Sequence, residues 1–310
     1  MSGFAYAREV AARPAVAPAI LCENVVKIYK VADLEVVALQ GLDLSVDAGE
    51  LIAVVGASGS GKSTLQNILG AVDTATAGHV EVAGHDLAAL GERERTLYRR
   101  RVVGFVWQQT SRNLLPYLTA AENVELPMSL TASGVKERRA RAAELLELVG
   151  LGARASHRPD ALSGGEQQRA AVATALANAP SILLADEPTG ELDSDSAGEL
   201  FETLRSVNRE LGVTTVVFTH DPLVSEQVGR TVGIRDGRTS TETLRRLEQG
   251  PAGEERLVAE ELAVLDRAGR LQLPRDYVTA LALERRVRLV LEGDHVVIWP
   301  EERDGEPDGR

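Results

Sequence analysis

The chain has 310 residues, of which 44% are hydrophobic and 26% charged, and its formal net charge is −12. This composition is typical of a folded globular protein and argues against a disordered, collagenous or coiled-coil chain. The acidic balance disfavours generic binding to nucleic acid or to an anionic membrane surface, because such binding depends on clustered lysine and arginine. The length predicts one large domain with a smaller one attached.

Residues 1–19 are rich in alanine and proline but lack the basic start and continuous apolar run of a signal peptide, and we expect a flexible tail. No window reaches about 18 consecutive apolar residues, so the chain is not expected to span a bilayer by itself, and any membrane role needs a partner. The single cysteine, Cys22, cannot form an internal disulfide, which fits a reducing compartment.

Between residues 20 and 238, short aliphatic runs alternate with longer helical patterns, which predicts an α/β fold built on a parallel sheet. The aliphatic runs predict strands at 51–55, 102–107, 182–185 and 214–219. Apolar residues at three- and four-residue intervals predict helices at 63–69, 135–149, 166–179 and 197–211. Residues 34–46 and 78–82 are more typical of antiparallel strands, so we expect a β-rich subdomain beside the main sheet.

The pattern changes after Gly237, and we place a domain boundary at residue 238. Residues 239–261 are predicted to form a polar helix, over 239–247, and a linker around 248–253 that is rich in glycine and proline. The apolar periodicity of residues 262–300 predicts a small β-rich domain. The acidic tail, 301–310, is expected to be disordered.

A glycine-rich loop lies between the strand predicted at 51–55 and the helix predicted at 63–69. It has the form G-x-x-x-x-G-K-S, in which backbone N–H groups and the start of a helix surround a phosphate. We expect Lys62 to contact the β- and γ-phosphates of ATP and the Ser63 hydroxyl to ligate Mg²⁺; a glycine-rich turn that ends a strand is the alternative. The nucleotide-binding residues predicted here are Gly56, Ser58, Gly59, Ser60, Gly61, Lys62, Ser63 and Thr64.

Two acidic residues, Asp186 and Glu187, end the aliphatic run at 182–185. A turn-forming acid after a buried strand would account for Asp186 alone. Beside a phosphate-binding loop the pair is better interpreted as catalytic: Asp186 holds Mg²⁺ through water, and Glu187 polarises the attacking water as general base. This pair is common to many P-loop ATPases and does not choose among them.

The run Leu162-Ser163-Gly164-Gly165-Glu166 opens the helix predicted at 166–179. It is typical of a helix N-cap, with Ser163 as the cap and Glu166 in the first turn. The same bare amides can also bind an anion, here the γ-phosphate held by another subunit. The run resembles the LSGGQ signature of the ATP-binding subunits of ATP-binding cassette (ABC) transporters, with Glu166 where the family usually has glutamine.

The resemblance covers residues 20–238, and it implies a P-loop NTPase cassette with a RecA-like core, an antiparallel β subdomain and a helical signature subdomain. It implies that Tyr29 stacks on adenine, and that Gln108 meets Mg²⁺ and water and begins a loop touching the membrane subunit. It also implies that Asp193 lies in a loop passing between two subunits, and that His220 senses the γ-phosphate. Without the other motifs, Tyr29 would be a strand-edge tyrosine and His220 a capping histidine.

Within the family, the runs at 69–74, 115–124 and 185–190 resemble the branch of lipoprotein-releasing and macrolide-exporting transporters and of the cell-division ATPase FtsE. The branch implies a homodimer bound to a separate transmembrane permease of the FtsX or MacB type, at the cytoplasmic face of the cell membrane, for export or mechanotransmission. The stretch between Gln108 and Leu114 is longer than is usual in the branch, so we expect a specialised permease-facing surface. No motif of this chain identifies the transported substrate or the direction of transport.

The last segment has a second resemblance, to the AbrB/MazE swapped-hairpin fold, a small β-rich dimer often used to bind DNA. The runs at 264–275, 281–283 and 287–298 carry it. Residues 253–310 hold fourteen acidic and nine basic residues, a net charge of −5, which disfavours DNA as the ligand. We therefore expect residues 262–300 to act in dimerisation.

Two other functions compete with a transport ATPase. A soluble cassette ATPase of DNA repair would have a coiled coil inserted in the ATPase, and one of translation would have two cassettes in one chain; this sequence has neither. An ATP-sensing DNA-binding regulator is suggested only by the last segment. Nucleic acid is therefore an unlikely partner on composition as well as on motifs.

Overall fold

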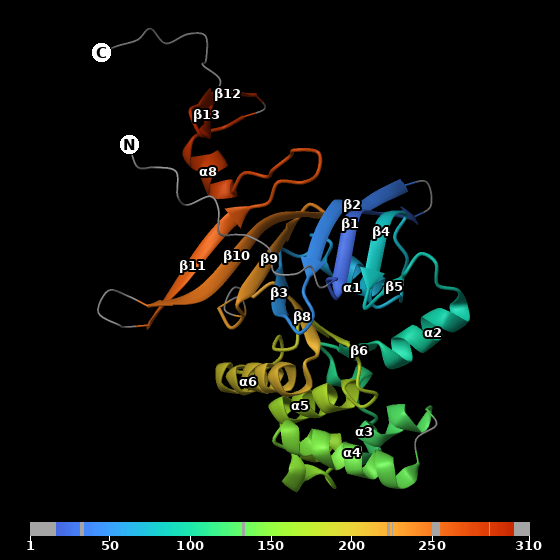
Figure 1. The fold of residues 1–310 in the computed structure, drawn as a ribbon. Coiled ribbons are helices and arrows are strands. Elements are labelled where there is room, and N and C mark those ends of the chain that lie inside the picture. The colour runs from blue at the N-terminus through green and yellow to red at the C-terminus, as the bar shows by residue number, and fades with distance from the viewer. Residues whose placement is uncertain are drawn as a thin grey trace.

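The computed structural model describes residues 17–31, 34–131, 134–221, 224, 226–249, 255–284 and 286–300. A seven-stranded sheet with the order β11-β10-β9-β3-β8-β7-β6 runs through the centre of the molecule (Figure 1). Its strands are β3 (Leu51–Val55), β6 (Val103–Val106), β7 (Ile182–Asp186), β8 (Thr214–Thr219), β9 (Arg230–Arg235), β10 (Arg238–Gln249) and β11 (Glu255–Ala263). Strands β6, β7, β8, β3 and β9 are parallel, which confirms the α/β fold expected from the sequence.

The inner strands of this sheet are aliphatic because both of their faces are covered. Successive side chains point to opposite faces, so Ile52 and Val54 of β3 join one buried layer and Ala53 joins the other. All six residues of β8 are buried. The strands predicted at 51–55, 102–107, 182–185 and 214–219 are thereby confirmed to within two residues.

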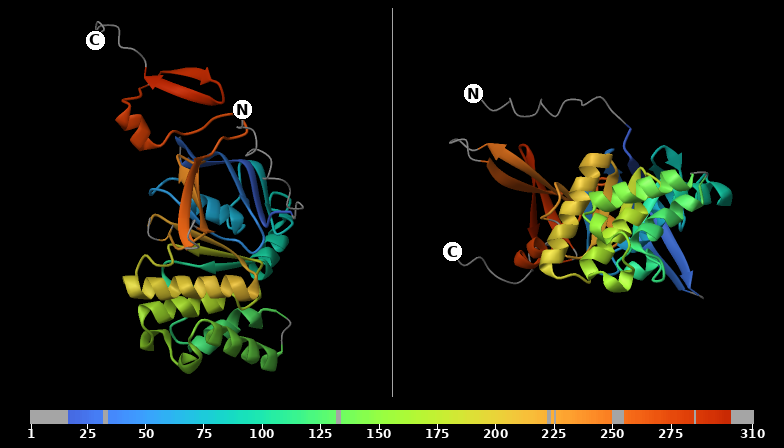
Figure 2. Two further views of the ribbon diagram at one scale, coloured as in Figure 1. Left: turned by 60° about the vertical axis from the view of Figure 1, so that its left-hand side comes forward. Right: turned by 90° about the horizontal axis from the view of Figure 1, so that it is seen from below.

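One layer consists of a second, antiparallel sheet with the order β2-β1-β4-β5, together with helix α1. Figure 2 shows α1 between this sheet and the main one. The elements of the layer are β1 (Ile20–Val31), β2 (Leu34–Val46), α1 (Lys62–Leu69), β4 (Ala77–Val82), β5 (His85–Asp86) and α2 (Glu92–Arg101). The antiparallel strands expected at 34–46 and 78–82 are confirmed.

The other layer is helical and lies on the side of the molecule opposite the chain's last elements (Figure 1). Its elements are η1 (Thr110–Arg112), α3 (Ala120–Ser129), α4 (Val135–Leu148), η2 (Gly152–Arg154), η3 (Pro159–Ala161), α5 (Gly164–Ala175) and α6 (Ser194–Leu211). The helix predicted at 166–179 ends at Ala175, because the chain turns at Ala179, whose φ is +50°, ahead of Pro180. The remaining predicted helices are confirmed.

The prediction of a helix at 239–247 is wrong, because these residues belong to strand β10. Asp236 and Gly237 have φ values of +52° and +71° and close a two-residue hairpin, so β10 pairs antiparallel with β9. Strand β11 then pairs with β10 along Glu255–Ala263. The two strands extend the main sheet past the boundary expected at residue 238. Part of the expected linker, residues 250–253, lies outside the described residues.

The chain ends in a small unit made of α8 (Arg275–Ala280) and a two-stranded antiparallel sheet of β12 (Val287–Glu292) and β13 (His295–Pro300). These strands agree with the β-rich C-terminal segment expected from the sequence. The tails predicted at residues 1–16 and 301–310 lie outside the described residues.

Candidate nucleotide site

A cavity of about 590 Å³ opens where the carboxyl ends of parallel strands β3, β7 and β8 meet. Ligands of open α/β sheets bind at this edge, because loops from several strands converge there. The lining residues come from separate parts of the chain: Val36, Val37, Ala38, Ser58, Gly59, Gly61, Lys62, Ser63, Thr64, Gln108, Asp186, Glu187 and His220. The fold thus brings together the phosphate-binding loop, both acidic residues, Gln108 and His220.

The phosphate-binding loop depends on glycine at its sharpest bend. Gly61 has a φ of +108°, and a Cβ there would lie 2.8 Å from the carbonyl oxygen of Ala38. Lys62 follows it as the first residue of α1, whose N-terminus has no side-chain cap, so backbone N–H groups point into the cavity region. The Lys62 ammonium donates to the carbonyl oxygens of Gly56 (2.7 Å) and Ala57 (3.1 Å). The loop therefore offers a fixed positive charge and backbone donors, which is what a phosphate requires.

The carboxylate of Glu187 is held by two neighbours. Its Oε2 accepts a hydrogen bond from Thr219 Oγ1 (2.8 Å), and its Oε1 lies 2.7 Å from Nδ1 of His220. Glu187 has a φ of +44°, and its N–H donates to the carbonyl of Phe218 (2.8 Å), so strand β8 also fixes the backbone. A carboxylate positioned on both oxygens can orient a water molecule, which is what a general base does.

Asp186 is partly buried beside Glu187, and burial together with the neighbouring charge of Glu187 raises the pKa of Asp186. A carboxyl whose charge is disfavoured in this way gains from a bound cation. Asp186, Ser63 and Gln108 line one cavity and supply carboxylate, hydroxyl and amide oxygens, the donor set that Mg²⁺ prefers. The residues present therefore fit a magnesium ion.

Gln108 begins a loop that is tied to the signature helix α5. Gln168 of α5 donates from Nε2 to the carbonyl of Trp107 (3.1 Å), and Thr110 donates to Oε1 of Gln167 (3.0 Å). Asn113 closes the loop by donating to the carbonyl of Phe105 (2.6 Å). The loop is therefore anchored to α5 through Trp107 and Thr110 and to β6 through Asn113.

The signature residues lie outside the lining of the cavity. Ser163 caps α5, where its Oγ accepts from the N–H of Glu166 (3.2 Å) and its own N–H donates to that carboxylate (2.8 Å). This second hydrogen bond is the main cause that lowers the pKa of Glu166. Asp193 caps α6 by accepting from the N–H (2.9 Å) and from the hydroxyl (3.0 Å) of Ser196. Leu192 lies against Gly164, so the turn before α5 and the turn before α6 share one surface. This surface is separate from the phosphate-binding loop of the same chain.

Three other predicted residues also lie beside the cavity rather than in its lining. Tyr29 of β1 donates its hydroxyl to Asp73 (2.8 Å), and Lys27 lies over its ring at 4.7 Å from the centroid. Gly56 is packed under the loop, where a Cβ would lie 2.3 Å from the carbonyl of Ile234, and Ser60 is buried beside it.

Sequence reasoning missed two features of the site. Thr219, which holds Glu187, follows a run of β-branched residues and gives no signal of its own. The wall formed by residues 36–38 comes from the antiparallel sheet, which no local motif connects to the phosphate-binding loop. Both features arise from contacts between distant strands.

Comparison with known proteins agrees with this geometry. A family model described as ABC transporter matches residues 39–190. The macrolide export ATP-binding/permease protein MacB of Brucella melitensis is 48% identical over 230 residues, which are 74% of this chain. The match is 35% of that protein's length, so the chain spans about a third of the MacB relative.

Two further relatives are matched over most of their length. The lipoprotein-releasing system ATP-binding protein LolD of Pseudoalteromonas translucida is 42% identical over 219 residues, 71% of this chain and 94% of LolD. A solved dimer of the ATP-binding cassette MJ0796, in a post-hydrolysis state with ADP and Pi, superposes with a TM-score of 0.65 at 43% identity. It covers 72% of this chain and 97% of the cassette. The chain therefore belongs to the ABC transporter family and carries the ATPase cassette of its LolD, MacB and MJ0796 relatives.

Proposed function

We propose that the chain is the ATP-hydrolysing subunit of an ABC transporter, working as a dimer on a separate permease for export or mechanotransmission. The observation that carries the proposal is the clamped carboxylate of Glu187, held by Thr219 and His220 in the cavity that Lys62 and Ser63 also line. A merely nucleotide-binding module would not need a carboxylate fixed on both oxygens.

In the proposed reaction, Lys62 and the N–H groups at the start of α1 bind the phosphates, and Tyr29 faces adenine. Ser63, Asp186 and Gln108 would hold Mg²⁺, which neutralises charge on the phosphates. Glu187 orients the attacking water and accepts its proton, while His220 keeps the carboxylate in place and contacts the γ-phosphate. Substitution of Glu187 by glutamine tests this mechanism, as set out in the Discussion.

The signature residues act on a second copy of the chain. Ser163, Gly164 and Gly165 stand at the start of α5, apart from the cavity of their own chain; Ser163 and Gly164 are exposed, while Gly165 is buried. We infer that they complete the site around Lys62 of the partner subunit, with Asp193 between the two sites. The dimeric arrangement of the MJ0796 relative supports this inference.

A mixed dimer offers the direct test. Subunits with Lys62→Ala and subunits with Ser163→Arg are each expected to be inactive alone, but their mixture should form one intact composite site in each heterodimer. ATP turnover should therefore return to about half of the wild-type rate per heterodimer, since catalysis at one site of two is retained. Random pairing of equal amounts would give about a quarter of the wild-type rate for the whole mixture. Complete inactivity of every mixture would contradict the composite site.

The permease is proposed to dock where the main sheet meets the helical layer. A groove of about 390 Å³ there is lined by Arg99, Arg100, Arg112 and Leu130, and none of the described residues lining it is acidic. Arg112 lies over the ring of Trp107, next to the loop that begins at Gln108. A permease segment with acidic residues would fit a groove of this charge on a chain that is otherwise acidic.

The proposed location is the cytoplasmic face of the cell membrane, through the permease. Among the described residues, no helix is long and apolar enough to cross a membrane. Replacing Arg100 by glutamate should reduce stimulation of ATP turnover by the reconstituted permease and leave basal turnover within about twofold, because a reversed charge repels a partner while Arg100 does not line the ATP cavity. Full stimulation of that variant would place the permease elsewhere.

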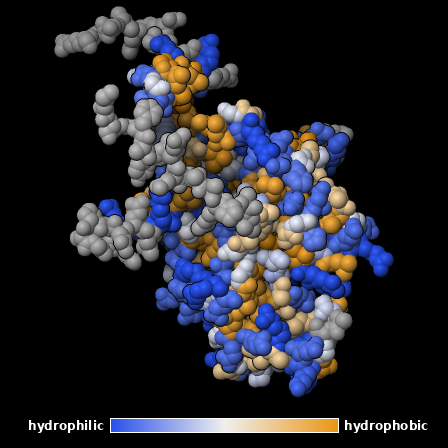
Figure 3. Space-filling view, in the orientation of Figure 1, coloured by the Kyte–Doolittle hydropathy of each residue, from blue (hydrophilic) through white to orange (hydrophobic). Residues whose placement is uncertain are grey.

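We also propose that residues 262–300, the segment resembling the AbrB/MazE fold, pair with the same segment of a second copy. Of the described residues in 261–300, none is buried. Apolar side chains gather on the surface of this unit (Figure 3). The most exposed include Tyr277, Leu281, Leu289, Leu291, Val296 and Trp299. A second copy is the favoured occupant because the cassettes are themselves proposed to act in pairs.

A further inference from the structure

The turn between β9 and β10 touches the phosphate-binding loop directly. The N–H of Gly237 donates to the carbonyl of Ser60 (3.0 Å), and the carbonyl of Gly237 accepts from the N–H of Gln40 (2.9 Å). Gly237 has a φ of +71°, and a Cβ there would lie 2.6 Å from the carbonyl oxygen of Ala38. The turn therefore joins the phosphate-binding loop to the β2 wall of the ATP cavity.

The phosphate-binding loop approaches the same point of β2 from its own side. A Cβ on Gly61 would lie 2.8 Å from the carbonyl of Ala38 and 3.6 Å from Cα of Gly237. The backbone of β2 at Ala38 thus lies against both the loop and the turn, with the Leu39 side chain packed beside Gly61. Because closely packed backbones have little room to relax, a shift of the turn is transmitted to the loop.

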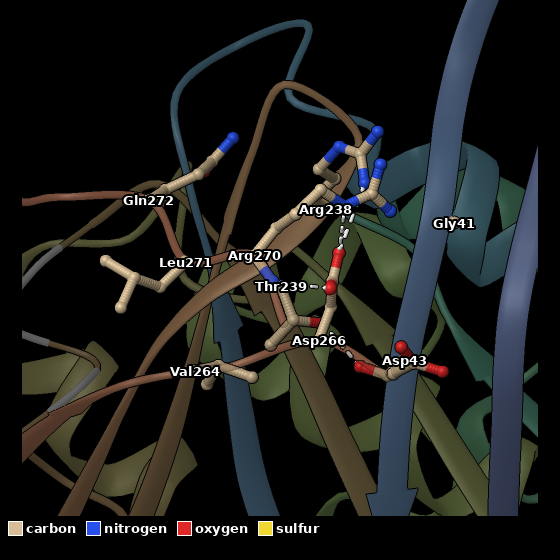
Figure 4. Close-up of a pocket in the computed structure, with 9 residues that line it drawn as sticks. All are labelled: Gly41, Asp43, Arg238, Thr239, Val264, Asp266, Arg270, Leu271 and Gln272. Carbon is tan, nitrogen blue, oxygen red and sulfur yellow. Dashed lines mark hydrogen bonds and ion pairs between the residues drawn. The ribbon is translucent and has the colours of Figure 1, made fainter. Parts of the chain in front are cut away.

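Residues 264–273, which follow β11, hold both flanks of this turn. On one flank, Arg235 donates from Nη2 to the carbonyl of Leu273 (2.8 Å) and from Nε to Oε1 of Gln272 (3.1 Å). On the other flank, Nη1 of Arg238 lies 3.5 Å from Oδ2 of Asp266. Figure 4 shows Arg238 and Arg270 converging on the Asp266 carboxylate, beside a cavity of about 360 Å³.

Asp266 is organised within its own segment to meet Arg238. Its Oδ1 accepts from the N–H groups of Ala268 and Arg270 (2.9 Å each), and its Oδ2 accepts from Nε of Arg270 (2.7 Å). The Arg270 N–H, with the other donors, holds the pKa of this carboxyl below its usual range. Among the described residues, Nη1 of Arg238 has no hydrogen-bond partner, which leaves Asp266 as its counter-charge.

A second anchor keeps the segment against the antiparallel sheet. Arg267 forms an ion pair with Glu23 and lies 3.8 Å from Oδ1 of Asp43. Asp43 in turn accepts from the N–H of Asn24 (2.8 Å), and the N–H of Val264 donates to the carbonyl of Ser240 (3.0 Å). Residues 264–273 therefore span the main sheet and the antiparallel sheet at the side of the ATP cavity.

We propose that Arg238 and Asp266 are positioning residues for ATP binding: residues 264–273 clamp the β9–β10 turn, and the turn keeps the phosphate-binding loop in its ATP-binding geometry. Neither residue touches the nucleotide. The clamp acts through Gly237 on Ser60, so its loss weakens nucleotide binding before it affects the chemical step.

The test is made on the full chain with MgATP as the only ligand. Asp266→Arg brings a third guanidinium next to Arg238 and Arg270. It should raise both the Kd for a fluorescent ATP analogue and the KM for ATP about fivefold, near the upper end of what a surface ion pair contributes, since the Arg238–Asp266 pair is largely shielded from solvent. The kcat should stay within about twofold, since Glu187 and its partners are distant from the clamp. The swapped pair, Arg238→Asp with Asp266→Arg, should restore only part of the affinity, because Arg270 and the N–H groups bound by Asp266 stay without their carboxylate.

Two further variants separate positioning from general stability. Arg246→Ala removes the ion pair with Glu260 (3.4 Å) in the β10–β11 hairpin, away from the turn, and should leave Kd and KM unchanged. Asp266→Asn removes the charge with little change of shape, and should give a smaller rise in Kd with unchanged thermal melting. The proposal is overturned if Asp266→Arg melts normally and binds ATP with wild-type affinity, or if Arg246→Ala weakens binding equally. Because no permease is used, failure here leaves the proposed transport function standing.

Discussion

The cassette and the C-terminal segment use apolar residues in opposite ways. In the cassette, Leu145, Leu184 and Phe218 are fully buried between a sheet and its neighbouring layers. In the C-terminal segment, Leu289 and Leu291 are 64% and 76% exposed, although they alternate on a strand as core residues would. Both regions are rich in aliphatic side chains, so composition does not distinguish them. The difference lies in how many layers each region can place around its strands.

Size explains the contrast. The cassette has two sheets and a layer of helices, so the inner strands of its central sheet, such as β3 and β8, find partners on both faces. The C-terminal unit has one helix of six residues and one two-stranded sheet. A two-stranded hairpin is at best marginally stable by itself. The cassette therefore folds around its own core, while the C-terminal unit needs a surface supplied from outside.

The largest expected effect tests whether ATP hydrolysis depends on the Glu187 carboxylate of the cassette. Glu187→Gln should retain ATP binding and lower kcat about 10²–10⁴-fold, because the amide cannot accept the proton of the attacking water. The rate of phosphate release at saturating MgATP measures it. Glu210→Gln, at an exposed position near the end of α6, is the matched control and should hydrolyse normally. Hydrolysis by Glu187→Gln at the wild-type rate would remove Glu187 from the mechanism.

The next effect sharpens the contrast in burial. Leu184→Ala should lower the free energy of unfolding by about 2–5 kcal/mol, since it leaves a cavity in a closed core. Leu291→Ala should change it by less than about 0.5 kcal/mol in the monomer, since the side chain is exposed. Urea unfolding at low protein concentration gives both values. Equal losses would mean that the C-terminal unit has a core of its own.

The third effect concerns the surface that the C-terminal unit needs. Sedimentation without nucleotide should show the full chain as a dimer at micromolar concentration, and the double variant Leu289→Glu, Leu291→Glu as a monomer, because charges on the exposed face prevent apolar pairing. Truncation after Ala263 should act in the same way. A monomeric wild-type chain would refute pairing between copies and leave a different partner for this face.

The smallest effect is the pH dependence of the metal site. Burial and the charge of Glu187 raise the pKa of Asp186, so protons compete with Mg²⁺ from a higher pH than at an ordinary aspartate. The affinity for Mg²⁺ in the presence of ATP should therefore fall as the pH drops through this raised pKa. The stability of the protein without metal depends on pH in the opposite direction. The contribution of Asp186 to the free energy of unfolding is fully present below its pKa in the unfolded chain and is lost as the pH rises through its raised pKa in the folded protein.

Calorimetric titration of Mg²⁺ at several pH values, compared with Asp186→Asn, measures this dependence. The asparagine variant should bind Mg²⁺ more weakly at all pH values and lose the pH dependence that Asp186 causes. A wild-type profile no steeper than that of Asp186→Asn would show that Asp186 does not titrate at the metal site.

The local motifs were predictable from the sequence because each one is short and carries its own backbone requirement. The bend at Gly61 requires a positive φ, which favours glycine. Ser163 is typical of a helix N-cap, and the aliphatic run at 182–185 is typical of a strand that is buried on both faces. Such requirements are satisfied within a few residues of the motif. They identified the phosphate-binding loop, the acidic pair and the signature turn, together with the central parallel strands.

Tertiary structure alone decided the features that depend on distant partners. Residues 239–247 carry a polar pattern that suits a helix, yet pairing with β9 and β11 makes them a strand, because a hydrogen-bond ladder on both sides outweighs local helix propensity. The Asp236-Gly237 dipeptide was the local signal for that hairpin. The clamp on Glu187, the β2 wall of the cavity and the contact between Gly237 and Ser60 join strands far apart in the chain, and only their packing brings them together.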